Sequence, residues 1–217
     1  MIKLSHDLNI STPTYGNRDE FIVTDIAQIS SGDSANSSGW KLTTNHIGTH
    51  IDVPRHFSDD GLTLTDYPDN FWFSDKVHLI NIPCNEAVLI DETMYDFTTI
   101  PESTEVLLIK TGYENYRTSD KYWNNNPGLA AKLGGFLREL LPHLKFVGFD
   151  FISLTSWKYR DEGKISHREF LVNNSILIIE DMKLRELNNP IINIIVSPIF
   201  VSNSNGGPAT VFANFKI

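Results

Sequence analysis

Two runs of this 217-residue chain, EVLLIK at residues 105–110 and KFVGFD at residues 145–150, lie on either side of a segment with helical spacing. Both runs are apolar on consecutive positions, which is typical of strands buried on both faces of a sheet. Between them, Asn126 and Pro127 form a helix start, apolar residues follow at helical spacing, and Pro142 ends the pattern. The order strand, helix, strand predicts a βαβ unit whose two strands are parallel.

Short aliphatic runs of the same kind recur along the rest of the chain. They are FIVTDI from Phe21, VHLINI from Val77, ILII from Ile176 and INIIVS from Ile192. Together they predict an α/β protein with a buried sheet. The polar stretch 30–38, SSGDSANSS, is a loop by composition, and Asp181 to Leu187 is a second, shorter helix candidate. The length suits one domain, so we expect residues 1–217 to form a single domain.

Composition narrows the class of protein. A net charge of −9 argues against nucleic acid, because phosphate binding needs clustered Lys and Arg, and against an anionic membrane surface. The first ten residues lack the features of a secretory signal, and no apolar run reaches the ~20 residues of a transmembrane helix. The single cysteine, Cys84, excludes an internal disulfide and is expected to be a small buried hydrophobe. We therefore expect a soluble, cytoplasmic protein.

Residues 46–54, HIGTHIDVP, gather ionisable side chains on one face of a predicted strand. β-Branched residues alternate with His46, Gly48, His50 and Asp52, and successive residues of a strand point to opposite faces. A helix would also pair His46 with His50, but the alternation, the glycine and a proline just downstream disfavour a helix.

The same stretch is dense enough in ligand types to predict a metal site. His50 and Asp52 would lie ~6.6 Å apart along a strand, a suitable separation for sharing one ion. A straight strand would place His46 ~13 Å from His50, so a bend at the glycine between them is expected. A turn after Asp52 would bring His56 into the same pocket. The alternative is that each histidine satisfies a local backbone hydrogen bond, but burying these groups without a metal would be costly.

Two further metal-capable residues lie in residues 166–181, SHREFLVNNSILIIED. His167 precedes an apolar strand and Glu180 ends it, and α/β proteins place active-site groups at strand ends. Glu180 could equally be a solvated carboxylate at a helix N-terminus, so this pair leaves both interpretations open. The other three histidines are expected to be structural or exposed: His6, His78 and His143.

HIGTHIDVPRHF, residues 46–57, resembles the HxGTHxDxPxHF signature of the cyclase family of metal-dependent hydrolases, which includes bacterial kynurenine formamidases and isatin hydrolases. Similar matches extend over most of the chain: DLNISTPTY, VLLIKTGY, YWNNNPGL, VGFDFISL, HREFL with ILIIED, and NGGPATVFA. The resemblance implies a layered α/β fold of the swivelling-domain type, with a parallel sheet, a smaller antiparallel sheet and flanking helices. It also implies a homodimer or a higher homo-oligomer.

The resemblance assigns metal ligands residue by residue. His46, His50 and Asp52 would bind a first ion, and Asp52 could bridge to a second ion held with His167 and Glu180. Imidazole and carboxylate ligands suit Zn²⁺, with Mn²⁺ as the alternative, so one or two such ions are expected per chain.

The resemblance also implies a chemistry. His56 would be the proton donor and acceptor, and Tyr15 would line the substrate pocket where formamidases often carry Trp. A metal-activated water would cleave a C–N amide bond in a small molecule, an aryl-formamide such as N-formylkynurenine. The alternatives are an isatin-like cyclic amide, a metal-dependent cyclase or lyase acting through an enolate, and a non-catalytic protein with a structural metal.

Four departures from the family pattern bear on these roles. Residues 15–21 read YGNRDEF in place of an aromatic followed by PGD, and Tyr15 itself replaces Trp. The spacing from His167 to Glu180 is one residue longer than usual, so a bulge could displace Glu180. Thr210 stands where many members have Arg. The metal site is compatible with these changes, whereas the substrate stays open.

Overall fold

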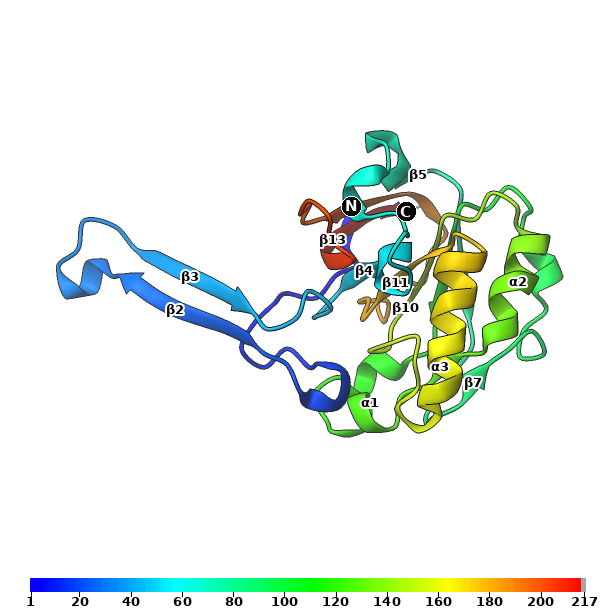
Figure 1. The fold of residues 1–217 in the computed structure, drawn as a ribbon, viewed down its shortest axis with the longest axis horizontal. Helices are drawn as coiled ribbons and strands as arrows, with labels where there is room; N and C mark the ends of the chain where they lie inside the picture. The colour runs from blue at the N-terminus through cyan, green and yellow to red at the C-terminus, as the bar shows by residue number, and fades with distance from the viewer. Residues whose placement is uncertain (216–217) are drawn as a thin grey trace.

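This computed structural model describes residues 1–215, and one nine-stranded sheet of mixed direction organises them (Figure 1). In spatial order, the main path of the sheet is β5 (Phe73–Ser74), β12 (Ile191–Pro198), β13 (Gly206–Phe215), β4 (His50–Asp52), β11 (Leu177–Glu180), β10 (Phe146–Phe149), β8 (Val106–Lys110) and β6 (Val77–Asn81), and β1 (Ile2–Lys3) pairs with β13. Strands β6, β8, β10 and β11 are parallel to one another, whereas β4, β13, β12 and β5 pair antiparallel with their neighbours.

The α/β class is confirmed, but the two kinds of strand pairing share one sheet. Strand β4 pairs antiparallel with β11 on one side and with β13 on the other, which joins the parallel half to the antiparallel half. Strands β8, β10 and β11 are buried on both faces, as their continuous apolar runs predict, whereas the edge strand β6 is mostly half-buried, so that expectation is wrong for VHLINI. Strand β12 alternates between buried and exposed residues, so the expectation of burial on both faces is wrong for INIIVS.

Two helices cover one face of the parallel half. They are α2 (Ala131–Leu140) and α3 (Arg160–His167), and α3 continues without a break into a π-helix, Arg168–Asn173 (Figure 1). Side chains of α2 and the π-helix pack with those of β8, β10 and β11 into one hydrophobic core, and a second core fills the opposite face. A short helix, α1 (Lys121–Asn124), follows the turn after β8.

The predicted βαβ unit is confirmed as β8, α2 and β10, with β8 and β10 parallel. The helix begins at Ala131, however, and not at Asn126 or Pro127, because Gly128–Leu129 form strand β9, which pairs with β7 (Leu89–Ile90). The Asn126 amide donates to the carbonyls of Ser153 and Thr155, which holds this segment against the chain that follows β10.

The helix predicted from Asp181 to Leu187 is wrong. This segment is irregular, and its backbone bonds outward, as where Lys183 N donates to the carbonyl of Leu4. Helix α3 and the π-helix were not predicted from the sequence. Cys84 is buried and its thiol donates to the carbonyl of Ile82, so its prediction as a small buried hydrophobe is confirmed.

A two-stranded hairpin, called here the arm, projects from the body of the molecule (Figure 1). It consists of β2 (Phe21–Ala27) and β3 (Ser37–Leu42), and the polar stretch 30–38 lies mainly in its tip. The expectation that FIVTDI is buried on both faces is wrong, because Val23 and Ile26 are exposed. Within residues 1–215, every helix is too short or too polar to span a lipid bilayer.

Candidate metal centre

A bend at Gly48 brings the first two histidines together. Gly48 has φ of 61°, and a Cβ there would lie 2.5 Å from Leu8 Cδ2, so this position requires glycine. The chain therefore turns between His46 and His50, and the centroids of their rings lie 5.3 Å apart. The predicted bend is confirmed, although the strand itself covers only residues 50–52.

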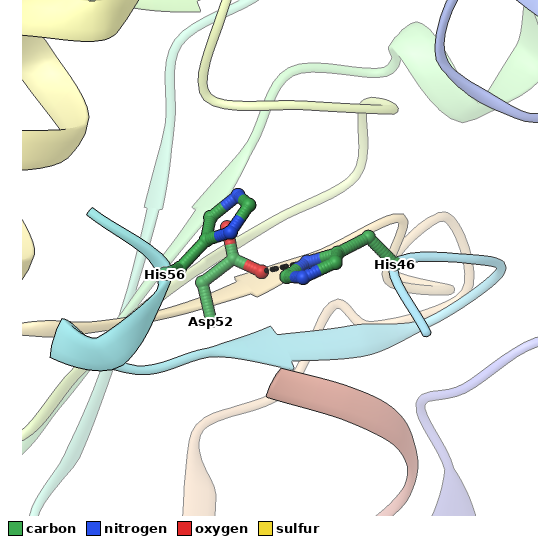
Figure 2. Close-up of side chains that lie close together, drawn as sticks. All are labelled: His46, Asp52 and His56. Carbon is green, nitrogen blue, oxygen red and sulfur yellow. Dashed lines mark hydrogen bonds and ion pairs between the residues drawn. The ribbon is translucent and has the colours of Figure 1, made fainter. Parts of the chain in front are cut away.

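A 3₁₀ turn, Pro54–His56, returns the chain to the same place. The ring of His56 stacks on that of His46 with centroids 4.0 Å apart, and Asp52 lies between and below the two rings (Figure 2). Asp52 Oδ1 accepts a hydrogen bond of 2.7 Å from His46 Nδ1. Ile51 and Val53 are fully buried in the opposite core, so the predicted division between a core face and a site face is confirmed.

The distal pair completes a cluster. Strand β11 places Glu180 directly opposite His50, and its Oε2 lies 3.3 Å from His50 Nε2. At the end of α3, His167 Nε2 lies 3.5 Å from Asp52 Oδ2 and 3.7 Å from Glu180 Oε1. Glu180 is buried, so it is not a solvated carboxylate at a helix N-terminus. We call these five residues the ligand cluster: His46, His50, Asp52, His167 and Glu180.

The longer spacing between His167 and Glu180 does not displace the carboxylate. The chain between them forms the π-helix, and a π-turn contains one more residue than an α-turn. The additional residue is therefore accommodated in the helix, and β11 keeps its register with β4.

The hydrogen bonds of the histidines leave a metal-binding nitrogen free on each of two rings. His50 Nδ1 lies 2.8 Å from the Gly48 carbonyl, and His167 Nδ1 lies 2.8 Å from the Gly163 carbonyl. Because a carbonyl only accepts, each Nδ1 carries a proton, and each Nε2 is directed at the carboxylates, where it can bind a metal ion once it has lost its own proton. His50 Nε2 is buried without a hydrogen-bond partner among residues 1–215. The carboxylates need positive charge beside these nitrogens, which a bound metal ion would supply in place of the protons on Nε2, so this arrangement fits a bound metal ion.

The charges in the cluster also indicate a site for a cation. Burial alone would lower the pKa of His50, but the Glu180 and Asp52 carboxylates raise it to about 9. They raise the pKa of His167 to about 10 against the same effect of burial. Burial opposes ionisation of Asp52, yet the neighbouring histidines hold its pKa well below the usual range. The carboxylates therefore draw positive charge into a buried space, which a divalent cation satisfies.

The donor atoms form two groups that share Asp52. One group is His50, Asp52 and Glu180, and the other is His46, Asp52 and His56, with the atoms of each group within 4.8 Å of one another. The resemblance places His50 with His46, whereas the structure groups it with Glu180. Shared use of Asp52 is compatible with one ion or with two.

A cavity of about 260 Å³ opens onto the cluster. Tyr15 and Phe57 line it, and the Tyr15 ring meets Trp157 edge-on with centroids 5.1 Å apart. The Tyr15 hydroxyl is buried with no partner among residues 1–215, and burial raises its pKa to about 12. Burial also lowers the pKa of His56 to about 4, although Asp52 opposes this shift. His56 is therefore a neutral imidazole at the cavity.

The Cyclase family model matches residues 2–155 of the chain. The chain belongs to the cyclase family of metal-dependent hydrolases. It is 27% identical to the kynurenine formamidase of Bacillus anthracis over 169 residues, which cover 77% of this chain and 76% of that protein. It is also 27% identical to Cyclase-like protein 1 of Arabidopsis thaliana over 192 residues, 84% of this chain and 71% of that protein.

Solved structures show the same fold. An isatin hydrolase bound to the product analogue thioisatinate superposes with a TM-score of 0.80 at 15% identity, covering 99% of this chain and 92% of that one. A potential metal-dependent hydrolase with cyclase activity gives a TM-score of 0.77 at 19% identity, covering 100% and 98%.

The substituted residues by which this chain departs from the family pattern lie in two places. Residues 15–17 form a tight turn, in which a Cβ on Gly16 would lie 2.4 Å from the Trp157 ring. Thr210 is exposed on β13 and lines a separate cavity. Sequence analysis missed Trp157, which no motif marks, and Asn205, whose Oδ1 lies 3.2 Å from His46 Nε2. The remaining histidines agree with their prediction: His6 and His78 are half-buried, and His143 is exposed.

Proposed function

We propose that this chain hydrolyses a C–N amide bond in a small aromatic substrate, with an aryl-formamide such as N-formylkynurenine as the first candidate. The observation that carries the proposal is a neutral histidine, His56, beside a buried cluster of metal-ligand types at the floor of an aromatic-walled cavity. The kynurenine formamidases among its relatives support this substrate class.

The ligand cluster would hold one or two ions, with Zn²⁺ favoured and Mn²⁺ as the alternative. A bound ion of this kind polarises a carbonyl and makes water a nucleophile at neutral pH. The cluster is buried at the cavity floor, so a substrate carbonyl reaches it only when the rest of the substrate occupies the cavity. Tyr15 and Phe57 then supply flat apolar surfaces that orient an aromatic ring, and Trp157 packs edge-on against Tyr15.

His56 is the residue of this chain that moves a proton. Because burial lowers its pKa, the ring is uncharged at neutral pH and can accept a proton from the attacking water. It then donates that proton to the leaving nitrogen, which would otherwise depart as an unstable anion. The stacked ring of His46 fixes the position of His56, and the adjacent Asp52 carboxylate stabilises its charged form.

The first experiment measures the metal content of the purified protein and its hydrolysis of N-formylkynurenine before and after chelation. We expect bound zinc or manganese, and turnover that chelation abolishes and metal restores. Metal without turnover would move the substrate to another carbonyl compound. A protein that takes up no metal, even after reloading, would contradict the proposal.

The second experiment separates metal binding from proton transfer. His56→Ala should keep the metal and lose ~10²–10⁴-fold in kcat, which is the usual contribution of general acid–base catalysis. His143→Ala, which changes an exposed histidine outside the cavity lining, is the matched control and should behave as the parent. Unchanged turnover in His56→Ala would remove His56 from the mechanism.

A cyclic amide of the isatin type is a second candidate substrate, which the fold shared with isatin hydrolases supports. Parallel assays with isatin and N-formylkynurenine would separate the two. A cyclase or lyase acting through an enolate would consume no water, so the absence of ¹⁸O from labelled water in the product would favour that chemistry.

A further inference from the structure

Glu180 and Asp181 are consecutive buried carboxylates that point in different directions. Asp181 has φ of 51°, a left-handed conformation that is uncommon for a residue with a Cβ. Because of this turn, Glu180 faces the ligand cluster, whereas Asp181 faces the segment that follows β8. A shift of the turn would move the end of β11, from which the Glu180 side chain reaches the ligand cluster.

Arg117 and Tyr122 hold the side chain of Asp181. The Arg117 guanidinium binds it in a fork, with 2.9 Å from Nε to Oδ1 and 2.7 Å from Nη2 to Oδ2. The Tyr122 hydroxyl donates to Oδ1 over 2.5 Å. Asp181 is 1% exposed, and so deeply buried a carboxylate is stable only with such partners.

The main chain of Asp181 also connects Glu180 to β4. The Thr49 hydroxyl donates to the Asp181 carbonyl over 2.5 Å, and Thr49 directly precedes His50. His50 and Glu180 are partners in the β4–β11 register. The hydrogen bond from Thr49 to Asp181 therefore links the two strands next to the positions that carry these candidate ligands.

The turn after β8, which carries Arg117, also contacts the chain beyond Asp181 through a second residue. Glu114 lies in the 3₁₀ turn Tyr113–Tyr116, which Arg117 closes. Its Oε2 accepts hydrogen bonds from the backbone nitrogens of Leu184 and Arg185, at 2.8 and 2.7 Å. The turn after β8 thus holds the segment following Glu180 at two points, through Arg117 and through Glu114.

We propose that Arg117 and Asp181 are positioning residues that set the direction of the Glu180 carboxylate toward the metal. The proposal rests on Glu180 being a metal ligand, as in the proposed function. Without the guanidinium, Asp181 would be a buried unpaired carboxylate beside Glu180, and the turn would shift to bring it to water. Loss of an outer partner of a metal ligand weakens metal affinity about 10- to 100-fold, and we expect this range for Arg117→Met.

The test measures metal binding directly, without substrate. Zn²⁺ affinity is determined by competition with a chromophoric chelator, and the ligand geometry by the absorption spectrum of the Co²⁺-loaded protein. Arg117→Met should weaken Zn²⁺ binding and change the Co²⁺ spectrum, and Arg117→Lys, which keeps the charge but not the fork, should lie between it and the parent. Asp181→Asn, a residue that tolerates the left-handed turn, keeps the test available if Arg117→Met does not fold, and we expect an affinity loss of about tenfold.

Arg138→Met is the matched control. Arg138 is half-buried and donates to the backbone carbonyls of Pro142, Leu144 and Asn174, in contacts that do not include the ligand cluster. It should lower thermal stability and leave Zn²⁺ affinity and the Co²⁺ spectrum unchanged. Parental affinity and spectrum in folded Arg117→Met and Asp181→Asn would overturn the positioning proposal.

Glu180→Gln separates this proposal from the one on which it rests. Weakened Zn²⁺ binding in Glu180→Gln, with parental binding in the Arg117 and Asp181 variants, would overturn positioning alone. Parental binding in Glu180→Gln would overturn the ligand assignment of Glu180 and the positioning proposal with it.

Discussion

At the scale of single residues, the Tyr15 hydroxyl is positioned to donate a hydrogen bond to a substrate in the cavity. It is buried at the cavity with no partner among residues 1–215, and its pKa, raised to about 12 by burial, keeps it protonated through the neutral range. Since a raised pKa means that the proton is lost only near pH 12, Tyr15 contributes no titration between pH 6 and 10.

Tyr15→Phe should therefore lower kcat/KM about tenfold, the effect of one lost hydrogen bond of about 1.4 kcal/mol, and leave the shape of the pH profile unchanged. The measurement is kcat/KM against pH for the parent and the variant from pH 6 to 10. A limb of the profile that disappears in Tyr15→Phe would show instead that the phenol titrates in this range.

The sequence predicts the position of some of these residues better than others. His46, His50 and Asp52 could be placed together because strand alternation and one glycine bend are local properties of the chain. Arg117 has no such signal, because its partner Asp181 is 64 positions away and their contact depends on the packing of the whole sheet. The residues that carry local periodicity are thus predictable, whereas those that position them are not.

At the scale of elements, helix α3 depends on a glycine that lies against the chain following β10. A Cβ on Gly163 would lie 2.3 Å from Thr155 Oγ1, and Thr155 Oγ1 lies 3.2 Å from His167 Nδ1. Gly135 in α2 is different, since the nearest heavy atom to a Cβ there is 4.0 Å away.

Gly163→Ala should destabilise the fold by about 1–3 kcal/mol through overpacking, and it should weaken Zn²⁺ binding because Thr155 and His167 must move. Gly135→Ala is the control and should gain about 0.5–1 kcal/mol from helix propensity with unchanged metal affinity. Thermal melting and chelator competition measure both effects. A lower melting temperature with parental affinity in Gly163→Ala would mean that α3 does not set the position of His167.

Element boundaries show where periodicity misleads. The spacing of apolar residues in 131–141 identifies α2. Asn126, however, donates hydrogen bonds to the segment after β10, and because of this tertiary contact the helix begins at Ala131 and not at Asn126. Leu184 and Leu187 have helical spacing, yet both are buried in the second core from an irregular segment. Glu114 and Leu4 satisfy backbone nitrogens of that segment, so it has less need of helical hydrogen bonds.

At the scale of the whole molecule, the arm is the feature that the sequence could not predict. A run such as FIVTDI has strand character, but nothing in the run says which element covers it. The same limit applies to the mixed sheet, because β4 joins β11 and β13 across more than a hundred positions of the chain. Strand identity is local information, whereas strand partners are not.

We propose that the arm mediates the self-association expected for this family, as a homodimer or a higher homo-oligomer. A two-stranded hairpin alone is marginally stable in water, and four large apolar side chains of the arm are exposed: Val23 by 43%, Ile26 by 69%, Ile29 by 58% and Trp40 by 74%. Grouped apolar side chains at the surface mark sites of association. A second copy of the chain would cover them and stabilise the arm.

Trp40→Glu should therefore shift the protein toward the monomer, because it places a charge within the buried contact. Light scattering coupled to size exclusion measures the mass of the parent and the variant over a range of concentrations. Ile165→Glu is the control, since Ile165 is 53% exposed on α3, away from the arm, and we expect it to keep the parental mass. A parent that stays monomeric at every concentration would contradict association through the arm, and so would a Trp40→Glu variant of parental mass.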